Sequence, residues 1–214
     1  MVSRTMVGAS VKKGVKKAMG HAFLRVMGWR AEGAPPQEQR YVLIAAPHTT
    51  NWDLPFTLAL SFAFDVPIRW MGKHTLFEGP GGWFLRRLGG VPVVRSERTN
   101  MVDQMVERFG ERESLVLVVP TEGTRSRVPF WKSGFYHIAR GADVPIVCAF
   151  LDYSRREGGF GPAIRATGDV SRDMDAIRAF YADKVGKFPE KFGPVLLRKE
   201  AEAADASVAD RESH

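Results

Sequence analysis

Short apolar runs alternate with helical patterns along most of the sequence, and this alternation most constrains the fold. The apolar runs predict strands at residues 41–46, 67–71, 91–95, 115–119, 144–151 and 163–167. Helical patterns lie at residues 54–64, 78–88, 100–109 and 133–140, and we expect Ser171 to cap a further helix. Strands that alternate with helices favour an α/β fold, so we predict a single domain with a mostly parallel sheet flanked by helices.

The N-terminal segment has a different pattern. Apolar residues recur every three or four positions between Met6 and Met27, while most of the basic residues fall on the other face. This predicts a basic amphipathic helix over residues 6–29, a type of helix that either lies in a membrane interface or packs its apolar stripe on the domain. We therefore divide the chain into an N-terminal helix at 1–33, a domain at 34–199 and a tail at 200–214. The tail is acidic, rich in alanine and without aromatics, which predicts disorder.

Charge and cysteine content limit the class of protein. The 31 Lys and Arg residues exceed the 24 Asp and Glu residues, so the net charge of +7 suits phosphates, nucleic acid or an acidic membrane surface. One cysteine, Cys148, excludes an internal disulfide and is typical of a reducing compartment. No run approaches the roughly 18 apolar residues of a membrane span, and no signal-peptide pattern opens the chain. We therefore expect a cytoplasmic protein.

His48 and Asp53 lie between the predicted strand 41–46 and the predicted helix 54–64. Residues five positions apart on a regular helix point about 140° apart, so the two side chains meet only if His48 stands outside the helix and folds back. A histidine oriented by a carboxylate is a general base that takes a proton from a hydroxyl. Taken alone, the pair is more typical of a loop histidine bonded to a helix cap.

A polar segment follows the predicted strand 115–119. Gly123 allows close approach of a ligand to the backbone, Thr124 offers a hydroxyl, and Arg125 is suited to binding phosphate. Glu122 is placed to hold an arginine or to accept a substrate hydroxyl. A polar turn with solvated arginines is the alternative for this segment.

Two further basic residues border the same region of the sequence. Arg95 ends the predicted strand 91–95, and Lys132 immediately precedes the predicted helix 133–140. Both are candidates to reach the same anion as Arg125, and Lys132 is also compatible with a simple surface position.

Five motifs in a fixed order resemble the glycerolipid acyltransferase superfamily, that is, the 1-acylglycerol-3-phosphate or lysophospholipid acyltransferases. The resemblance covers about residues 41–151. In chain order the motifs are His48 to Asp53, Gly89 to Arg95, Glu122 to Ser126, Lys132 to Gly134, and Val144 to Val147.

The resemblance implies transfer of a fatty acyl group from acyl-CoA or acyl-carrier protein to the hydroxyl of a lysophospholipid. His48 would be the general base, and Asp53 would orient it. Arg125, with Gly123 and Thr124, would hold the phosphate of the acceptor, and Glu122 would position Arg125 or a neighbouring hydroxyl. Arg95 is a second candidate for the phosphate. The chemistry implied requires no metal and no cofactor beyond the acyl donor, and the domain at 34–199 would be the acyltransferase domain.

Several alternatives stay open beside this prediction. The acceptor could be another lipid, such as a lyso-aminolipid, or the chain could be a transacylase. It could also be a non-catalytic protein that binds anionic lipid. Nucleic acid is disfavoured because no recognised nucleic-acid motif is present. The resemblance and the amphipathic helix together predict a peripheral protein on the cytoplasmic face of a membrane, with the anionic surface as a partner.

Overall fold

The computed structural model describes residues 4–93 and 98–202. Its centre is a sheet of seven strands in the order β1-β7-β6-β2-β5-β3-β4. All neighbouring pairs are parallel except β6–β7. The strands are β1 (Arg30–Glu32), β2 (Arg40–Ala46), β3 (Ile68–Lys73), β4 (Gly90–Val93), β5 (Leu115–Pro120), β6 (Ile146–Asp152) and β7 (Glu157–Ile164). The predicted α/β class, with a mostly parallel sheet, is confirmed.

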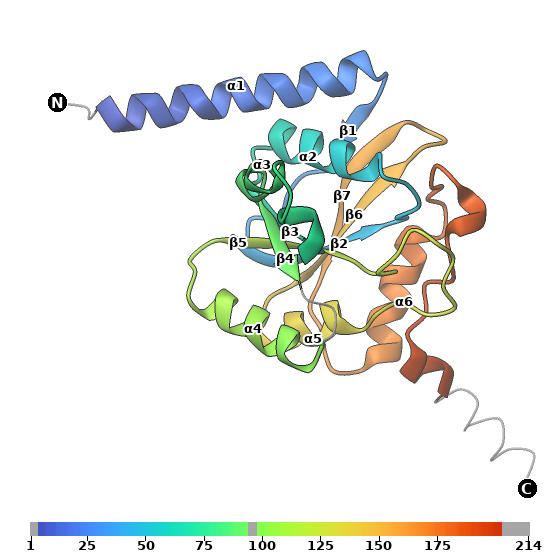
Figure 1. The fold of residues 1–214 in the computed structure, drawn as a ribbon. Helices are drawn as coiled ribbons and strands as arrows, with labels where there is room; N and C mark the ends of the chain where they lie inside the picture. The colour runs from blue at the N-terminus through green and yellow to red at the C-terminus, as the bar shows by residue number, and fades with distance from the viewer. Residues whose placement is uncertain (1–3, 94–97, 203–214) are drawn as a thin grey trace, which may run out of the picture.

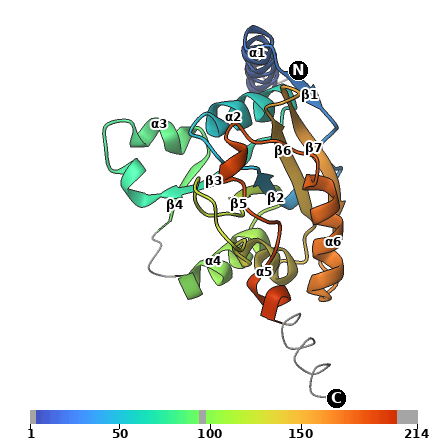
Figure 2. The same cartoon turned by 90° about the vertical axis from the view of Figure 1, so that its right-hand side faces the viewer.

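Helices cover both faces of the sheet (Figure 1). Helices α1 (Arg4–Val26) and α2 (Asp53–Ala63) lie on one side, and α3 (Gly82–Arg87) lies near β3 and β4. Helices α4 (Arg98–Gly110), α5 (Gly134–Gly141) and α6 (Val170–Tyr181) lie on the other side, as Figure 2 also shows. Two short 3₁₀ helices, η1 (His74–Phe77) and η2 (Pro189–Lys191), complete the described elements.

Alternate residues of each strand point to opposite faces of the sheet. On the side of α4, α5 and α6, which we call the packed face, Val42, Ile44 and Leu117 join one continuous core with residues of those helices. On the side of α2, which we call the α2 face, Leu43 and Val118 belong to a separate cluster. The same central strands therefore serve two different cores.

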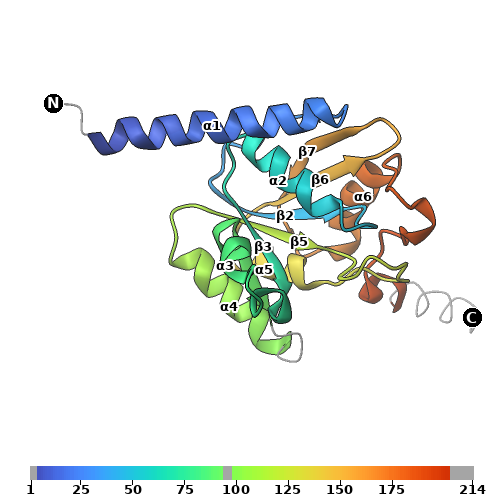
Figure 3. The same ribbon diagram turned by 45° about the horizontal axis from the view of Figure 1, so that its top comes forward.

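Helix α1 packs on α2 through only part of its length. A Cβ at Gly20 would lie 2.5 Å from the backbone oxygen of Ala59, so glycine permits the close approach. Leu24 is buried beside it, whereas Val15, Met19 and Val26 are exposed by 54, 58 and 85%. Figure 3 shows the N-terminal half of α1 extending past the rest of the domain. Within the described ranges, no helix has the length and hydropathy needed to cross a bilayer.

The end of α1 differs from its predicted position. The helix stops at Val26 rather than running to residue 29, because Gly28 takes a φ of 69° and the N–H of Trp29 bonds the carbonyl of Leu24 at 2.8 Å. Residues 30–32, which we grouped with the helix, form β1 and pair with β7.

Other boundaries also differ from the predictions. Strand β7 covers 157–164 rather than 163–167, and α3 is shorter than the predicted helix 78–88. Asp169, not Ser171, caps α6, since its side chain accepts the N–H of Arg172. Glu200, the first residue of the predicted disordered tail, accepts the N–H of Leu197 at 2.7 Å. Residues 203–214 of that tail lie outside the described residues.

Candidate active site

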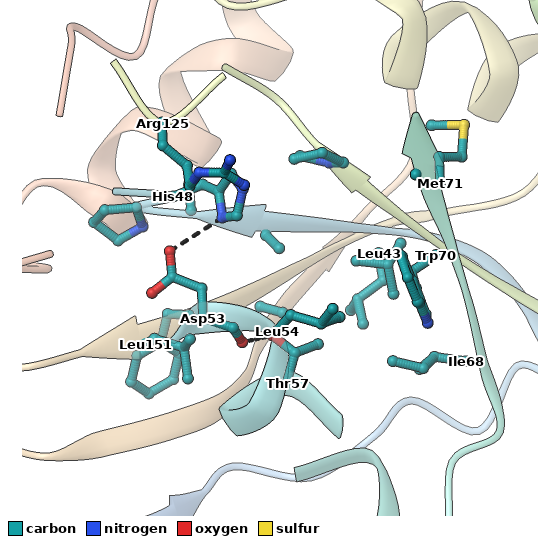
Figure 4. A pocket seen from close by; sticks show the side chains of 18 of the residues that line it. Leu43, His48, Asp53, Leu54, Thr57, Ile68, Trp70, Met71, Arg125 and Leu151 are labelled. Carbon is teal, nitrogen blue, oxygen red and sulfur yellow. Dashed lines mark hydrogen bonds and ion pairs between the residues drawn. The ribbon is translucent and has the colours of Figure 1, made fainter. Parts of the chain in front are cut away.

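The loop between β2 and α2 brings His48 and Asp53 together (Figure 4). Asp53 is the first residue of α2, and His48 lies outside the helix, as the five-residue spacing required. His48 Nδ1 lies 3.1 Å from Asp53 Oδ2. The backbone N–H groups of Thr49 and Thr50 donate to the same oxygen at 3.0 Å each, so the loop wraps around the carboxylate. Nε2 is the other ring nitrogen, and among the described residues it has no hydrogen-bond partner.

Asp53 is only 3% exposed, and its second oxygen also has a partner. The hydroxyl of Tyr153, one residue beyond β6, donates to Asp53 Oδ1 at 2.8 Å. We did not predict Tyr153 from the sequence, because it stands 100 positions from Asp53 and belongs to no motif.

A hydrogen bond to Glu122 links the His48 loop to the end of β5. Glu122 Oε2 accepts the backbone N–H of His48 at 2.8 Å, whereas the buried Oε1 has no hydrogen-bond partner among the described residues. Burial raises the pKa of Glu122 to about 7, although the His48 N–H acts in the opposite direction. Within the described part of the chain, no hydrogen bond or ion pair joins Glu122 to Arg125, so the predicted link between them is replaced by a link to the His48 loop.

A segment near the C-terminus crosses the His48 loop. We call residues 185–193 the strap. The N–H of Phe188 bonds the hydroxyl of Thr49 at 3.3 Å, and a Cβ at Gly186 would lie 2.9 Å from the Thr49 side chain. The strap therefore contacts the loop that carries the histidine through Thr49.

The three predicted cationic residues differ in where they lie relative to the cavity beside His48. Arg125 is exposed and lines the same cavity as His48, and its side chain reaches toward the imidazole in Figure 4. Lys132 lies close to Gly123, which has a φ of 69° and whose Cβ would lie 3.3 Å from the stem of that lysine. Arg95 lies outside the described residues. Lys73, at the end of β3, also lines the cavity and was not among the predicted site residues.

The cavity beside His48 has a volume of about 500 Å³ and extends between α2 and the sheet. Space remains there because the α2 face carries the small residues Ala45, Ala149 and Gly159. Large apolar side chains form most of the remaining wall, among them Leu43, Leu54, Leu60, Ile68, Trp70, Val118, Leu151 and Phe160. The cavity thus has a polar end at His48 and Arg125 and an apolar interior.

The polar groups inside this cavity are bonded to the protein itself. The hydroxyl of Thr57 donates to the carbonyl of Asp53 at 2.7 Å, and that of Ser61 donates to the carbonyl of Leu58 at 2.9 Å. The indole N–H of Trp70 donates to the carbonyl of Leu88 at 3.0 Å. Since these donors are already satisfied, the interior favours an apolar occupant.

A smaller cavity of about 150 Å³ adjoins the first one, and Gly123 lines both. Lys73 and Lys132 line it together with apolar residues such as Met101, Phe135 and Ile138. Cys148 is elsewhere, fully buried on the packed face, where burial raises the pKa of its thiol to about 12. No group of three or more potential ligands for a metal ion occurs in residues 4–93 and 98–202.

Comparison with known proteins places this geometry in a family. The sequence model of the Acyltransferase family matches residues 30–151, more than half of the chain. The chain belongs to this acyltransferase family. His48, Asp53, Glu122 and Arg125 fall within the matched range, whereas Tyr153 and the strap follow it. The predicted resemblance to the glycerolipid acyltransferases is confirmed.

A solved structure supports the same assignment at the level of the fold. The 1-acyl-sn-glycerophosphate acyltransferase PlsC from Thermotoga maritima matches with a TM-score of 0.58 and 16% sequence identity. The match covers 86% of this acyltransferase and 84% of that chain. Among curated proteins, none matches the sequence.

Proposed function

We propose that this acyltransferase moves a fatty acyl group from a thioester donor, acyl-CoA or acyl-carrier protein, to the hydroxyl of a lysophospholipid. The observation that carries the proposal is the His48–Asp53 pair at the polar end of an apolar cavity of about 500 Å³. A general base at the mouth of a slot for a hydrocarbon chain brings together the two requirements of this reaction.

The proposed reaction uses His48 as base and then as acid. Nε2 takes the proton of the acceptor hydroxyl while the oxygen attacks the thioester carbonyl carbon. The tetrahedral intermediate then collapses, the C–S bond breaks, and the imidazolium returns the proton to the thiolate. Asp53 stabilises the imidazolium between these steps because its carboxylate faces Nδ1 at 3.1 Å. No covalent bond to the protein is formed.

The cationic rim supports an acceptor that carries phosphate. Arg125 and Lys73 both line the cavity with His48, and Lys132 lies next to Gly123. Arg125 is exposed and can meet a phosphate with two parallel N–H donors. The hydroxyl to be acylated would then lie between the phosphate and Nε2 of His48.

The apolar interior supports binding of the acyl chain of the donor. An acyl chain placed between α2 and the sheet would contact Leu54, Leu60 and Trp70, which line the cavity. This arrangement would leave the thioester carbonyl near His48 and the carrier outside. The smaller cavity, lined by Gly123 and Lys132, borders the proposed phosphate side instead.

The exposed face of α1 supports a membrane surface as partner. Val15, Met19 and Val26 are exposed, and Lys16 and Lys17 are exposed on the same helix. Apolar residues that enter the interface, together with lysines that attract anionic lipid, are typical of peripheral membrane helices. The protein would then meet its lipid acceptor on the cytoplasmic face of the membrane.

The function is tested by measuring acyl products by mass spectrometry with palmitoyl-CoA or palmitoyl-acyl-carrier protein as donor. Lysophosphatidic acid, lysophosphatidylcholine and a lyso-aminolipid serve as acceptors. We expect a diacyl product with a phosphate-bearing acceptor, and Arg125→Gln should raise the KM for that acceptor more than it lowers kcat. Product with the lyso-aminolipid alone would contradict the phosphate assignment, and no product with either donor would contradict the transferase assignment.

A further inference from the structure

Tyr153 joins the end of β6 to the proposed dyad from outside the family match. Its hydroxyl donates to Asp53 Oδ1 at 2.8 Å, while Oδ2 faces His48 Nδ1 and accepts the N–H groups of Thr49 and Thr50. The two oxygens of the carboxylate thus have separate partners. Rotation of the carboxylate group would break bonds on both sides, so the Tyr153 bond fixes the plane that faces the imidazole.

The ring of Tyr153 is itself held in place. It packs edge-on against Trp29, with 4.8 Å between the ring centroids, and against Phe56 at 6.0 Å. Trp29 stacks on Phe56 at 4.2 Å, and the backbone N–H of Tyr153 bonds the carbonyl of Val185 in the strap. Because ring and backbone are both anchored, the hydroxyl loses little freedom on bonding the carboxylate.

We propose that Tyr153 is a positioning residue of this acyltransferase, which holds the Asp53 carboxylate in the plane that orients His48. The proposal rests on the proposed function of His48 as base. Burial, reinforced by the charge of Asp53, raises the pKa of Tyr153 far above its ordinary value. A raised pKa is consistent with a hydroxyl that stays protonated and donates to the Asp53 carboxylate.

The donated hydrogen bond also limits the charge that Asp53 presents to His48. Without it, more of the negative charge would act on the imidazole, and the protonated form of His48 would be favoured. Among the described residues, the charged and titratable groups that contact His48 or line its cavity are Asp53 on α2, Glu122 and Arg125 after β5, and Lys73 at the end of β3. Tyr153→Phe would remove none of these groups, so a change in the titration of His48 would come from the altered Asp53 carboxylate.

The test is Tyr153→Phe, which removes the hydroxyl and keeps the ring between Trp29 and Phe56. Tyr136→Phe is the matched control, because Tyr136 donates to the buried carboxylate of Asp173 at 2.7 Å on the packed face. We expect Tyr153→Phe to lower kcat by about 10-fold, with little change in KM, since a hydrogen bond to a charged group is lost. The acid limb of its pH profile should move to higher pH. Tyr136→Phe should leave both unchanged in the folded protein.

The effect of Tyr153 on His48 can also be measured without turnover, so it can be tested separately from the proposed function. Titration of the His48 imidazole by NMR should show an upward pKa shift in Tyr153→Phe relative to the wild type and none in Tyr136→Phe. Equal titration curves in all three proteins would overturn the proposal, as would equal losses of kcat in both variants with unchanged pH profiles. If the His48 pKa rose in Tyr153→Phe but the wild type showed no acyl transfer, the proposed reaction would be wrong, while the effect of Tyr153 on His48 would still be supported.

Discussion

The two faces of the central sheet are built from the same strands but are filled differently. On the packed face, Val42, Ile44 and Ile146 are completely buried against helices. On the α2 face, the neighbouring positions Ala45 and Ala149 are small and border a cavity of about 500 Å³. Alternate residues of one strand therefore serve stability on one side and leave room for a ligand on the other. Substitutions on the two faces should separate these effects.

Asp53→Asn should cause a large loss of activity, second only to the loss of His48 itself. The amide can still accept the Thr49 and Thr50 N–H groups, but it lacks the charge that stabilises protonated His48. We expect kcat to fall by about 100-fold or more, comparable to the loss of general base catalysis. Steady-state kinetics measure this, and Asp173→Asn on the packed face is the matched control. Similar losses in both variants would contradict the division between the faces.

The largest effect on stability should come from the packed face. Ile177 of α6 is fully buried there. Ile177→Ala should lower the free energy of unfolding by about 2–5 kcal/mol, because it removes buried methyl groups and leaves a cavity. Urea unfolding measures the change. The folded fraction of the variant should keep the specific activity of the wild type, and a selective loss of activity would contradict the comparison.

Glu122, at the end of β5, should give stability a pH dependence. Its pKa is about 7 in the folded protein and about 4.5 when unfolded, so its contribution is fully present below the unfolded pKa and is lost as pH rises through the folded pKa. Glu122→Gln removes this loss. The unfolding free energy of the variant relative to wild type should rise by about 2 kcal/mol between pH 5 and pH 8. Urea titrations measure this difference. If variant and wild type differed in unfolding free energy by the same amount at pH 5 and pH 8, burial would not raise the pKa of Glu122.

A smaller effect should come from filling the cavity on the α2 face. Ala149→Leu places a larger side chain in the proposed slot for the acyl chain. We expect kcat/KM for palmitoyl-CoA to fall about 10-fold relative to that for octanoyl-CoA. The same change at the exposed Ala163 of β7 is the control. If Ala149→Leu left the ratio of kcat/KM for palmitoyl-CoA to that for octanoyl-CoA unchanged, the acyl chain would bind elsewhere.

The predicted fold was correct wherever apolar patterning was strong. The run Tyr41–Ala46 is buried on both faces of the sheet, and the helix after it begins at Asp53 as its first-turn Pro55 allows. Strand β7 was misplaced because glycines weaken a strand pattern. Those glycines are required by packing: a Cβ at Gly159 would lie 1.9 Å from the Glu32 oxygen of β1.

Motif residues near one another in the sequence were easier to predict than contacts made by the fold. The meeting of His48 and Asp53 follows from a loop and a helix start, which local sequence indicates. The bond from Glu122 to the His48 N–H and the bond from Tyr153 to Asp53 depend on how β5 and β6 flank β2. Nothing in the spacing of these residues specifies that arrangement. We therefore predicted Glu122 as a site residue without its bond to the His48 N–H, and we did not predict Tyr153.

The decisive experiment compares thiol release from palmitoyl-CoA by wild type and His48→Ala, with and without lysophosphatidic acid. We expect the wild type to release thiol only with the acceptor. We expect His48→Ala to lose this release while its circular dichroism spectrum and melting temperature stay unchanged. Acceptor-dependent release that persists in His48→Ala would contradict the claim that His48 is the base.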